Sequence, residues 1–321
     1  PYMVIDQRAD HSLRVPRPDL SQSLGTPNAC SQGGCHDDKE LSWSVDAFTR
    51  WYGEAKKPHY GPILAAGREG RPEAVAGLLR LAADELYPAI VRATALSLLG
   101  RFPGEESTRV FASALADPEA LVRHTAATSV VAANPEDLVD LVAPLLFDPV
   151  KAVRMQAALQ LADAPEELLK PYQREALRET IAEYRRAMEY SLDFAFAGHN
   201  LGNLSARLGD AAAAERYYRM AIAIDDLFYP AKANLAVLLN ARGLNDEAEA
   251  LLRSILEAYP EQYDVAYSLG LLLAEMGRYK EAERYLALAA AGMPSHPGAE
   301  RNLRAIRDYL ARVGGASQPA R

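Results

Sequence analysis

Apolar and small residues recur with a fixed period in the C-terminal part of the chain. Leu201, Leu235 and Leu269 lie 34 residues apart, and a small residue follows each of them. A glycine, an alanine and a large apolar residue repeat with the same period (Gly209, Gly243 and Gly277; Ala214, Ala248 and Ala282; Tyr218, Leu252 and Leu286). A glycine ends a helix at little cost because it can take a left-handed conformation. Each unit is therefore predicted to be two helices, with the small residue allowing their close approach and Pro260 or Pro294 ending the second.

This pattern resembles the tetratricopeptide repeat (TPR) family across residues 195–294. Arrays of such repeats need about three copies and a polar cap. Residues 298–313 form an amphipathic pattern that predicts a capping helix, and residues 171–192 predict a long helix that precedes the array.

A second repeat lies upstream of the first. Its pairs of valine and arginine are 31 residues apart, a proline precedes each pair, and an alanine-rich helix is predicted after it (Val91-Arg92, Val122-Arg123 and Val153-Arg154). This resembles HEAT-type repeats, in which Asp-Pro begins a turn and Val-Arg begins the second helix. Asp117-Pro118 and Asp148-Pro149 match that pattern, whereas Tyr87-Pro88 departs from it. The resemblance implies that the arginines join neighbouring repeats through charge-assisted hydrogen bonds.

The composition is that of an ordinary globular protein, with 49% hydrophobic and 24% charged residues. No apolar run reaches the roughly 18 residues that span a bilayer, so we expect no membrane span. The net charge of −8 argues against nucleic acid as a partner. No glycine-rich phosphate loop stands between a strand and a helix.

The N-terminal residues 1–58 contain both cysteines of the chain, in a stretch rich in turn-forming residues. Cys30 and Cys35 are followed directly by His36, which is the attachment pattern of c-type haem. Two thiols add to the vinyl groups of the porphyrin, and the adjacent imidazole binds the iron. Four residues separate the cysteines instead of the usual two, a less common spacing found in some low-potential multihaem cytochromes.

Three other interpretations of Cys30 and Cys35 stay open. A disulfide would close only a small loop and stabilise the fold little. Zinc needs four ligands, and the sequence offers the two thiols, His36 and one of Asp37 or Asp38 without a second pair. The third interpretation is that both thiols are idle.

The stretch from His11 to His36 resembles the last haem-binding segment of multihaem cytochromes that carry HEAT and TPR repeats behind their haem domain. The resemblance implies that the chain is the C-terminal part of such a protein and that further haem motifs precede it. The start at Pro1, without an initiator methionine, fits a piece of a longer chain or a processed form. A second axial ligand is needed, with His11 as the first candidate and His59 as the second. Covalent haem would place the protein in the periplasm or outside the cell.

Other residues have structural or binding interpretations. Trp43, Trp51 and Tyr52 are predicted to pack into a core, the alternative being the porphyrin edge. His124 is interpreted as structural and His296 as an exposed loop residue.

His199, Asn203 and Asn234 occupy the positions that line the groove in the TPR family. The basic residues that hold a terminal carboxylate in some TPR proteins are replaced by Asp264 and Ser268, so a basic or apolar peptide is the expected ligand.

The sequence thus predicts an all-α protein with an α-solenoid. Its parts are a haem-binding segment, HEAT-like repeats, a connecting helix, and three TPR repeats with a cap (1–58, 59–170, 171–192 and 193–321). The expected function is electron transfer to a redox partner that docks on the TPR groove, and the alternative is a haem-free interaction scaffold. No catalytic constellation stands out, which leaves enzymatic activity undecided.

Overall fold

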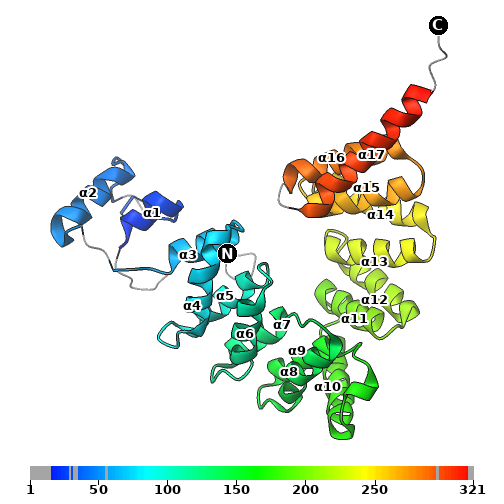
Figure 1. Cartoon of the computed structure of the whole chain (residues 1–321), viewed down its shortest axis with the longest axis horizontal. Coiled ribbons are helices and arrows are strands. Elements are labelled where there is room, and N and C mark those ends of the chain that lie inside the picture. The colour runs from blue at the N-terminus through cyan, green and yellow to red at the C-terminus, as the bar shows by residue number, and fades with distance from the viewer. Residues whose placement is uncertain (1–15, 29, 32–34, 55–56, 294–295, 317–321) are drawn as a thin grey trace. The chain divides into compact units, whose positions relative to one another are not determined.

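The computed structural model describes residues 16–28, 30–31, 35–54, 57–293 and 296–316. Within these residues the regular structure is helical throughout, and most helices pack against the next one along the chain (Figure 1). The predicted all-α class is therefore confirmed. The chain divides into two compact units, Pro1–Gln156 and Ala157–Arg321, and the division falls within helix α9.

The first unit begins with two helices that pack on each other, α1 (Pro18–Leu24) and α2 (Leu41–Tyr52). The side chains that these helices bury include small ones: Ser21 on α1, and Ser44 and Ala47 on α2. Small residues, rather than the bulky aromatic residues, thus occupy the buried positions of α2.

The rest of the first unit is a succession of short helices. They are α3 (Gly61–Arg68), η1 (Pro72–Ala74), α4 (Val75–Ala83), α5 (Ala89–Leu99), α6 (Glu105–Ala114), α7 (Ala120–Ser129), α8 (Pro135–Val142), η2 (Ala143–Phe147) and the start of α9 (Lys151–Gln160). The repeated valines Val91, Val122 and Val153 are all buried. Burial of these valines explains why the 31-residue period is visible in the sequence.

Two of the three repeated arginines join one helix pair to the next, as the resemblance to HEAT-type repeats implied, whereas Arg154 donates to the Asp148 and Pro149 carbonyls of the turn before its own helix. Arg92 pairs with Asp117, and both side chains are buried. Arg123 donates to both carboxylate oxygens of Asp148, from Nε at 2.6 Å and from Nη2 at 3.1 Å. Asp148 also accepts from the Val150 N–H at 2.8 Å, which fixes the turn before α9. Each aspartate therefore begins the turn before a helix and binds the arginine of the preceding repeat at the same time.

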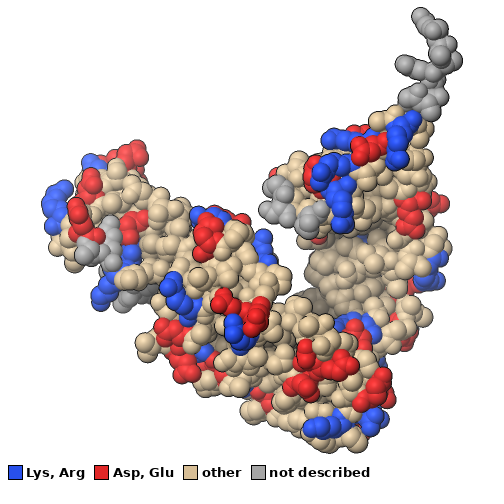
Figure 2. Space-filling model, in the orientation of Figure 1, with Lys and Arg blue, Asp and Glu red and all other residues tan. Residues whose placement is uncertain are grey.

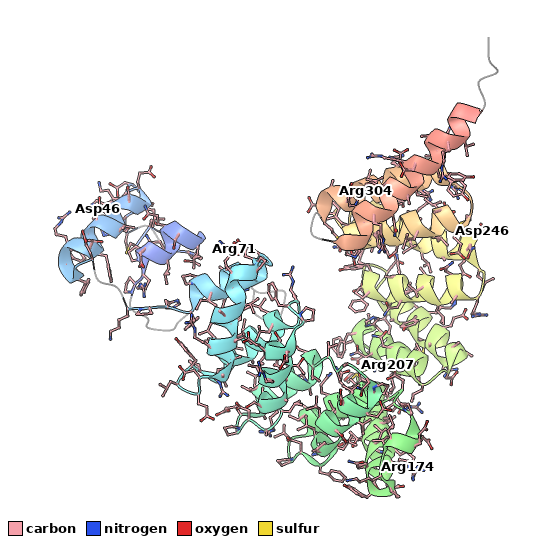
Figure 3. All side chains as sticks on the ribbon, in the orientation of Figure 1. Asp46, Arg71, Arg174, Arg207, Asp246 and Arg304 are labelled. Carbon is pink, nitrogen blue, oxygen red and sulfur yellow. The ribbon has the colours of Figure 1, made fainter. Side chains whose placement is uncertain are left out.

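The second unit contains η3 (Glu166–Leu168), the long helix α10 (Pro171–Tyr190) and seven further helices. These are α11 (Ala195–Arg207), α12 (Ala211–Ile224), α13 (Tyr229–Ala241), α14 (Asn245–Ala258), α15 (Tyr263–Glu275), α16 (Tyr279–Gly292) and α17 (Pro297–Ala316). The predicted connecting helix is α10, and the predicted capping helix is α17. Arg207, labelled in Figure 3, donates to Asp163 at 2.7 Å and so ties α11 to the turn after α9.

The two helices of each C-terminal pair approach closely at the small residue that the sequence singled out. A Cβ atom added at Gly202 would lie 2.4 Å from Cε1 of Tyr218, and one at Gly270 would lie 2.8 Å from Cγ of Leu286. The first helix of each pair is followed by a glycine with a left-handed backbone, and the φ angles are 78°, 75° and 77° (Gly209, Gly243 and Gly277). Both predicted roles of glycine are confirmed.

Ion pairs repeat along the second helices of the array. Arg219 bridges Glu215 and Glu247, and one repeat later Arg253 bridges Glu249 and Glu281. Glu283 accepts from Arg307 of the capping helix at 2.9 Å. In these two repeats, an arginine of one second helix thus pairs with a glutamate of its own helix and with a glutamate of the next second helix. Among the described residues, no helix has the length and apolar content to cross a membrane.

Candidate functional site: the first-helix face of the C-terminal helix pairs

The first helices of the C-terminal pairs share one surface, which we call the first-helix face. It is formed by α11, α13, α15 and α17, and its central residues are His199, Asn203, Asn234, Val237, Tyr267, Leu271 and Asn302. The three groove residues predicted from the sequence lie together on this face. Asn234 of α13 donates to Nε2 of His199 at 3.0 Å and to Oδ1 of Asn203 at 2.7 Å, both on α11.

Tyr218 of α12 completes this group, which we call the first polar cluster (His199, Asn203, Tyr218 and Asn234). Its hydroxyl donates to Oδ1 of Asn203 at 2.8 Å. The sequence assigned Tyr218 to the core, where it is buried, but did not assign it a role beside the groove. A tyrosine at the large apolar position of the repeat is the signal that indicates such a bond, because a buried hydroxyl needs a partner.

His199 of this cluster is a neutral imidazole at neutral pH, because burial lowers its pKa. Its Nε2 faces the amide donors of Asn234 and Asn203, at 3.0 and 3.4 Å, which assigns the ring proton to Nδ1. Burial lowers the pKa of His199, and the ring of Phe228 lies edge-on at 5.5 Å between centroids. Burial also raises the pKa of Tyr218, so the hydroxyl remains a donor at neutral pH.

The positions that bind a terminal carboxylate in some TPR proteins carry no cation here. Asp264 is exposed, and the Ser268 hydroxyl donates to the Asp264 carbonyl of its own helix at 3.0 Å. Lys232, nearby on α13, is buried and paired with Asp226. The face therefore has no described cation aimed at an acidic ligand at these positions.

The cysteine segment belongs to the first unit. Asn28 is buried and donates to the hydroxyls of Ser44 on α2 and of Ser31, both at 3.2 Å. Its Oδ1 accepts from the Cys30 N–H at 3.3 Å. Asn28 thus fixes the start of the cysteine segment to α2, a role that the sequence analysis did not assign. Its place directly after Pro27 in a turn was the available signal, because asparagine side chains bond nearby backbone in turns.

Cys30 is half-buried, whereas Cys35 and His36 are exposed. The His36 ring packs on Trp43 of α2, with 4.6 Å between the ring centroids. Covalent haem attachment needs two thiols and an imidazole that a porphyrin can reach, and exposed Cys35 and His36 with half-buried Cys30 fit that requirement.

The predicted core role of the aromatic residues on α2 is wrong for two of the three. Trp51 is 71% exposed and Tyr52 is 69% exposed, and only Trp43 is half-buried. The physical reason is that α2 buries Ser44 and Ala47 on its inner side, while the Tyr52 ring lies on Phe48 of the same helix, with 4.7 Å between the ring centroids. Asp46, labelled in Figure 3, is an exposed residue of the same helix.

The other histidines have distinct surroundings. His11 lies outside the described residues. Nδ1 of His59 accepts from the Gly61 N–H at 2.9 Å, and the ring stacks on Tyr60. Ligation through Nε2 would require a proton on Nδ1 and therefore the loss of that hydrogen bond. His124 is partly buried, and burial lowers its pKa.

The exposed position expected for His296 is confirmed, and its Nδ1 also accepts from the Ala299 N–H at 3.1 Å at the start of α17. In the described part of the chain, no three histidine, cysteine or acidic side chains are placed to share a metal ion.

Comparison with known proteins concerns the repeats. A family described as "Tetratricopeptide repeat" matches residues 240–305. The human protein "Tetratricopeptide repeat protein 8" is 24% identical over 113 residues, which are 35% of this chain and 21% of that protein. The chain thus spans about a fifth of the length of that relative.

Two solved structures are similar to part of the chain. One is described as "Crystal structure of MamA protein", with 18% identity, a TM-score of 0.35, and coverage of 50% of this chain and 92% of that one. The other is described as "Crystal structure of MamA", with 17% identity, a TM-score of 0.32, and coverage of 59% and 88%. The family match falls on α14 to α17, where the helix pairs and their glycine ends follow the period of 34. Residues 240–305 therefore match the tetratricopeptide repeat, and they lie within an array of paired helices.

Proposed function

We propose that this protein is a helical-repeat scaffold that binds a protein partner through the first-helix face. The observation that carries the proposal is the first polar cluster, in which Asn203 and Asn234 join two consecutive repeats. Both amides are half-buried, so they are held in place and still reach the surface. Among the hydrogen bonds of the described residues, none uses Oδ1 of Asn234.

An amide held in this way suits the backbone of a peptide. Oδ1 of Asn234 can accept from a peptide N–H, and the second N–H of Asn203 can donate to a peptide carbonyl. The cluster fixes both rotamers before a ligand arrives, which reduces the entropy lost on binding.

Selection of displayed random peptides on the full chain tests this function. Peptides that bind the protein are expected to lose affinity about fivefold or more in Asn203→Ala and Asn234→Ala, since each loses a backbone hydrogen bond. Asn245→Ala, at the start of α14 and outside the face, is the matched control and should leave affinity unchanged. Unchanged affinity in all three variants would remove the first-helix face as the binding site.

The finer division of the solenoid is also part of this proposal. Residues 59–170 are taken as HEAT-like repeats, supported by the Arg92–Asp117 and Arg123–Asp148 pairs that join successive helix pairs. Residues 193–321 are taken as three TPR repeats with α17 as the cap.

We also propose a c-type haem on Cys30, Cys35 and His36 as a second function. The support is the exposure of Cys35 and His36 and the attachment of the Cys30 backbone to Asn28. The thiols would hold the porphyrin covalently, and His36 would bind the iron. When bound, the haem would supply one-electron transfer. Asn28 and Ser44 would keep the segment on α2.

This second function has consequences for partner and location. The partner on the first-helix face would then be a redox protein, and the protein would be periplasmic or extracellular. His11 remains the first proposed second axial ligand, ahead of His59, whose Nδ1 is engaged with Gly61.

Production in a host that matures haem c tests the cofactor. The expected product is red, and its Soret band stays with the protein after acid-acetone extraction. Cys30→Ala combined with Cys35→Ala should be colourless, whereas His199→Gln, in the other unit, should stay red. Colourless wild-type protein of unmodified mass from that host would exclude haem attachment.

A further inference from the structure

A second polar cluster lies on the first-helix face beyond the first one. It consists of Tyr267, His296 and Asn302. Asn302 of α17 donates to the Tyr267 hydroxyl of α15 at 2.8 Å, and the His296 ring lies 4.8 Å from that of Tyr267.

The two polar clusters are related by two repeat periods. Tyr267 and Asn302 stand two repeats after His199 and Asn234, and His296 stands two repeats after Phe228. In both clusters a first helix is bonded to the next first helix, and a ring from the preceding loop packs on the central side chain. The face therefore has the same polar arrangement at two places.

The region between the clusters is small and apolar. The equivalent pair there is Ala233 and Ser268, and the Ser268 hydroxyl is bonded to its own helix. Val237 and Leu271 lie one and two periods after Asn203, and their exposed fractions are 64% and 39%. In Figure 2 the surface over α13 is mostly uncharged. Exposed apolar patches rimmed by polar residues are typical of interaction sites, and Val237 and Leu271 lie between the two polar clusters.

We infer that this centre of the first-helix face takes a large, uncharged apolar side chain of an extended peptide. The inference rests on the proposed function and specifies its ligand. The peptide backbone is held at both sides by amides, from Asn203 and Asn234 in the first cluster and from Asn302 in the second. An extended strand suits this arrangement, because its side chains alternate while its backbone groups stay available on both sides.

The described charges near the centre of the face do not favour an acidic ligand there. Lys232 is buried against Asp226, and Asp264 is exposed where a carboxylate-binding residue would stand. An acidic side chain at the centre would lose its hydration beside Val237 and Leu271 without gaining a cation. The ligand is therefore an internal apolar segment and does not need a free carboxyl terminus.

The test compares two leucines with the same exposure. Leu271 on α15 and Leu288 on α16 are each 39% exposed, but only Leu271 lies on the first-helix face. Displayed random peptides with blocked carboxyl termini serve as the probe against the full chain. We expect enrichment of a large apolar residue. For the enriched peptides, Leu271→Asp and Val237→Asp should weaken binding by about tenfold or more, since each removes an apolar contact and adds a charge. Leu288→Asp should leave binding unchanged.

The outcomes separate this inference from the function on which it rests. Peptides that depend on Asn203 and Asn234 but not on Leu271 would overturn the apolar centre and leave the face as a binding site. Enrichment of acidic peptides would overturn it in the same way. Equal losses in Leu271→Asp and Leu288→Asp would also overturn it, and no enrichment at all would overturn both proposals. Helical content by circular dichroism checks that each variant is folded.

Discussion

At the scale of single residues, Gly202 shows how one absent side chain fixes the distance between two helices. It lies on α11 against the ring of Tyr218 on α12, and a Cβ would meet Cε1 at 2.4 Å. A glycine inside a helix ordinarily costs about 1 kcal/mol relative to alanine. Here the Tyr218 ring occupies the space that an alanine side chain would need. Replacing the glycine by alanine is therefore expected to lower the stability of the helix pair instead of raising it.

Gly202→Ala is accordingly expected to destabilise the array by about 1–2 kcal/mol, because overpacking costs more than the helix propensity returns. Equilibrium urea denaturation measures this. The second repeat has Ala236 and Leu252 at these two positions, which suggests the compensated variant. Gly202→Ala with Tyr218→Leu should cost less than the sum of the two single changes. If the destabilisation of the double variant equals the sum of the two single changes, the Tyr218 ring is not what opposes the alanine side chain.

His199 gives the first-helix face a dependence on pH. Burial holds its folded pKa below the ordinary value of 6.5. The unfolded chain therefore binds the proton first as pH falls, and folding stability is lost from about pH 6.5 downward. Above that pH the contribution is fully present, because both states are neutral. Protonation would also turn Nε2 into a donor that faces the Asn234 amide.

We expect His199→Gln to flatten the stability profile between about pH 5 and 7, since glutamine has no proton to gain. Its carbonyl can still accept from Asn234. Urea denaturation at several pH values measures the slope. Burial also lowers the pKa of His124, so a remaining slope should disappear in the double variant with His124→Gln. An unchanged slope in His199→Gln would contradict the assignment of a buried neutral imidazole.

At the scale of helices, the arginine–aspartate pairs decide how one helix pair meets the next in the first unit. Arg123 belongs to α7, and Asp148 begins the turn before α9. Burial alone raises the pKa of Asp148, but the hydrogen bonds from Arg123 and from the Val150 N–H outweigh it, and the net pKa is lowered. The carboxylate is thus ionised and depends on these partners.

Arg123→Ala should destabilise the first unit by about 2–3 kcal/mol, because it leaves a buried carboxylate without its cation. The control is Arg109→Ala, which removes an exposed pair with Glu105 inside α6 and should cost about 0.5 kcal/mol or less. Chemical denaturation followed by circular dichroism compares the two. Equal effects would mean that the pair does not join the helix pairs energetically.

At the scale of the molecule, the sequence predicted the elements that repeat. The period of 34 and the Val-Arg pairs arise because each repeat buries the same positions, such as Leu201, Leu235 and Val122. The glycine ends and the arginine bridges followed from the same logic. The groove residues His199, Asn203 and Asn234 were also placed together, because equivalent positions of neighbouring repeats share a face.

The parts that do not repeat were harder to predict. Trp51 and Tyr52 are residue types that are common in protein cores, but α2 buries Ser44 and Ala47 instead. Asn28 looked like an ordinary turn residue, and its bond to Ser44 joins positions that no local pattern connects. The second polar cluster was missed because Tyr267 and Asn302 differ in residue type from His199 and Asn234, although their geometry corresponds.

A destabilising change in one helix of the chain is expected to affect mainly the helices packed next to it. In an array each repeat contacts mainly its neighbours, so stability is close to a sum of local contributions. Leu303 is buried on the cap α17, and α17 packs on α16. Leu303→Ala should remove about 2–4 kcal/mol locally, because it opens a cavity in the cap. Native-state hydrogen exchange is expected to become faster in α15 to α17 and to stay unchanged in α4 to α7, which have their own core in the first unit. Equal acceleration in both places would instead show that the two units open together as one cooperative body.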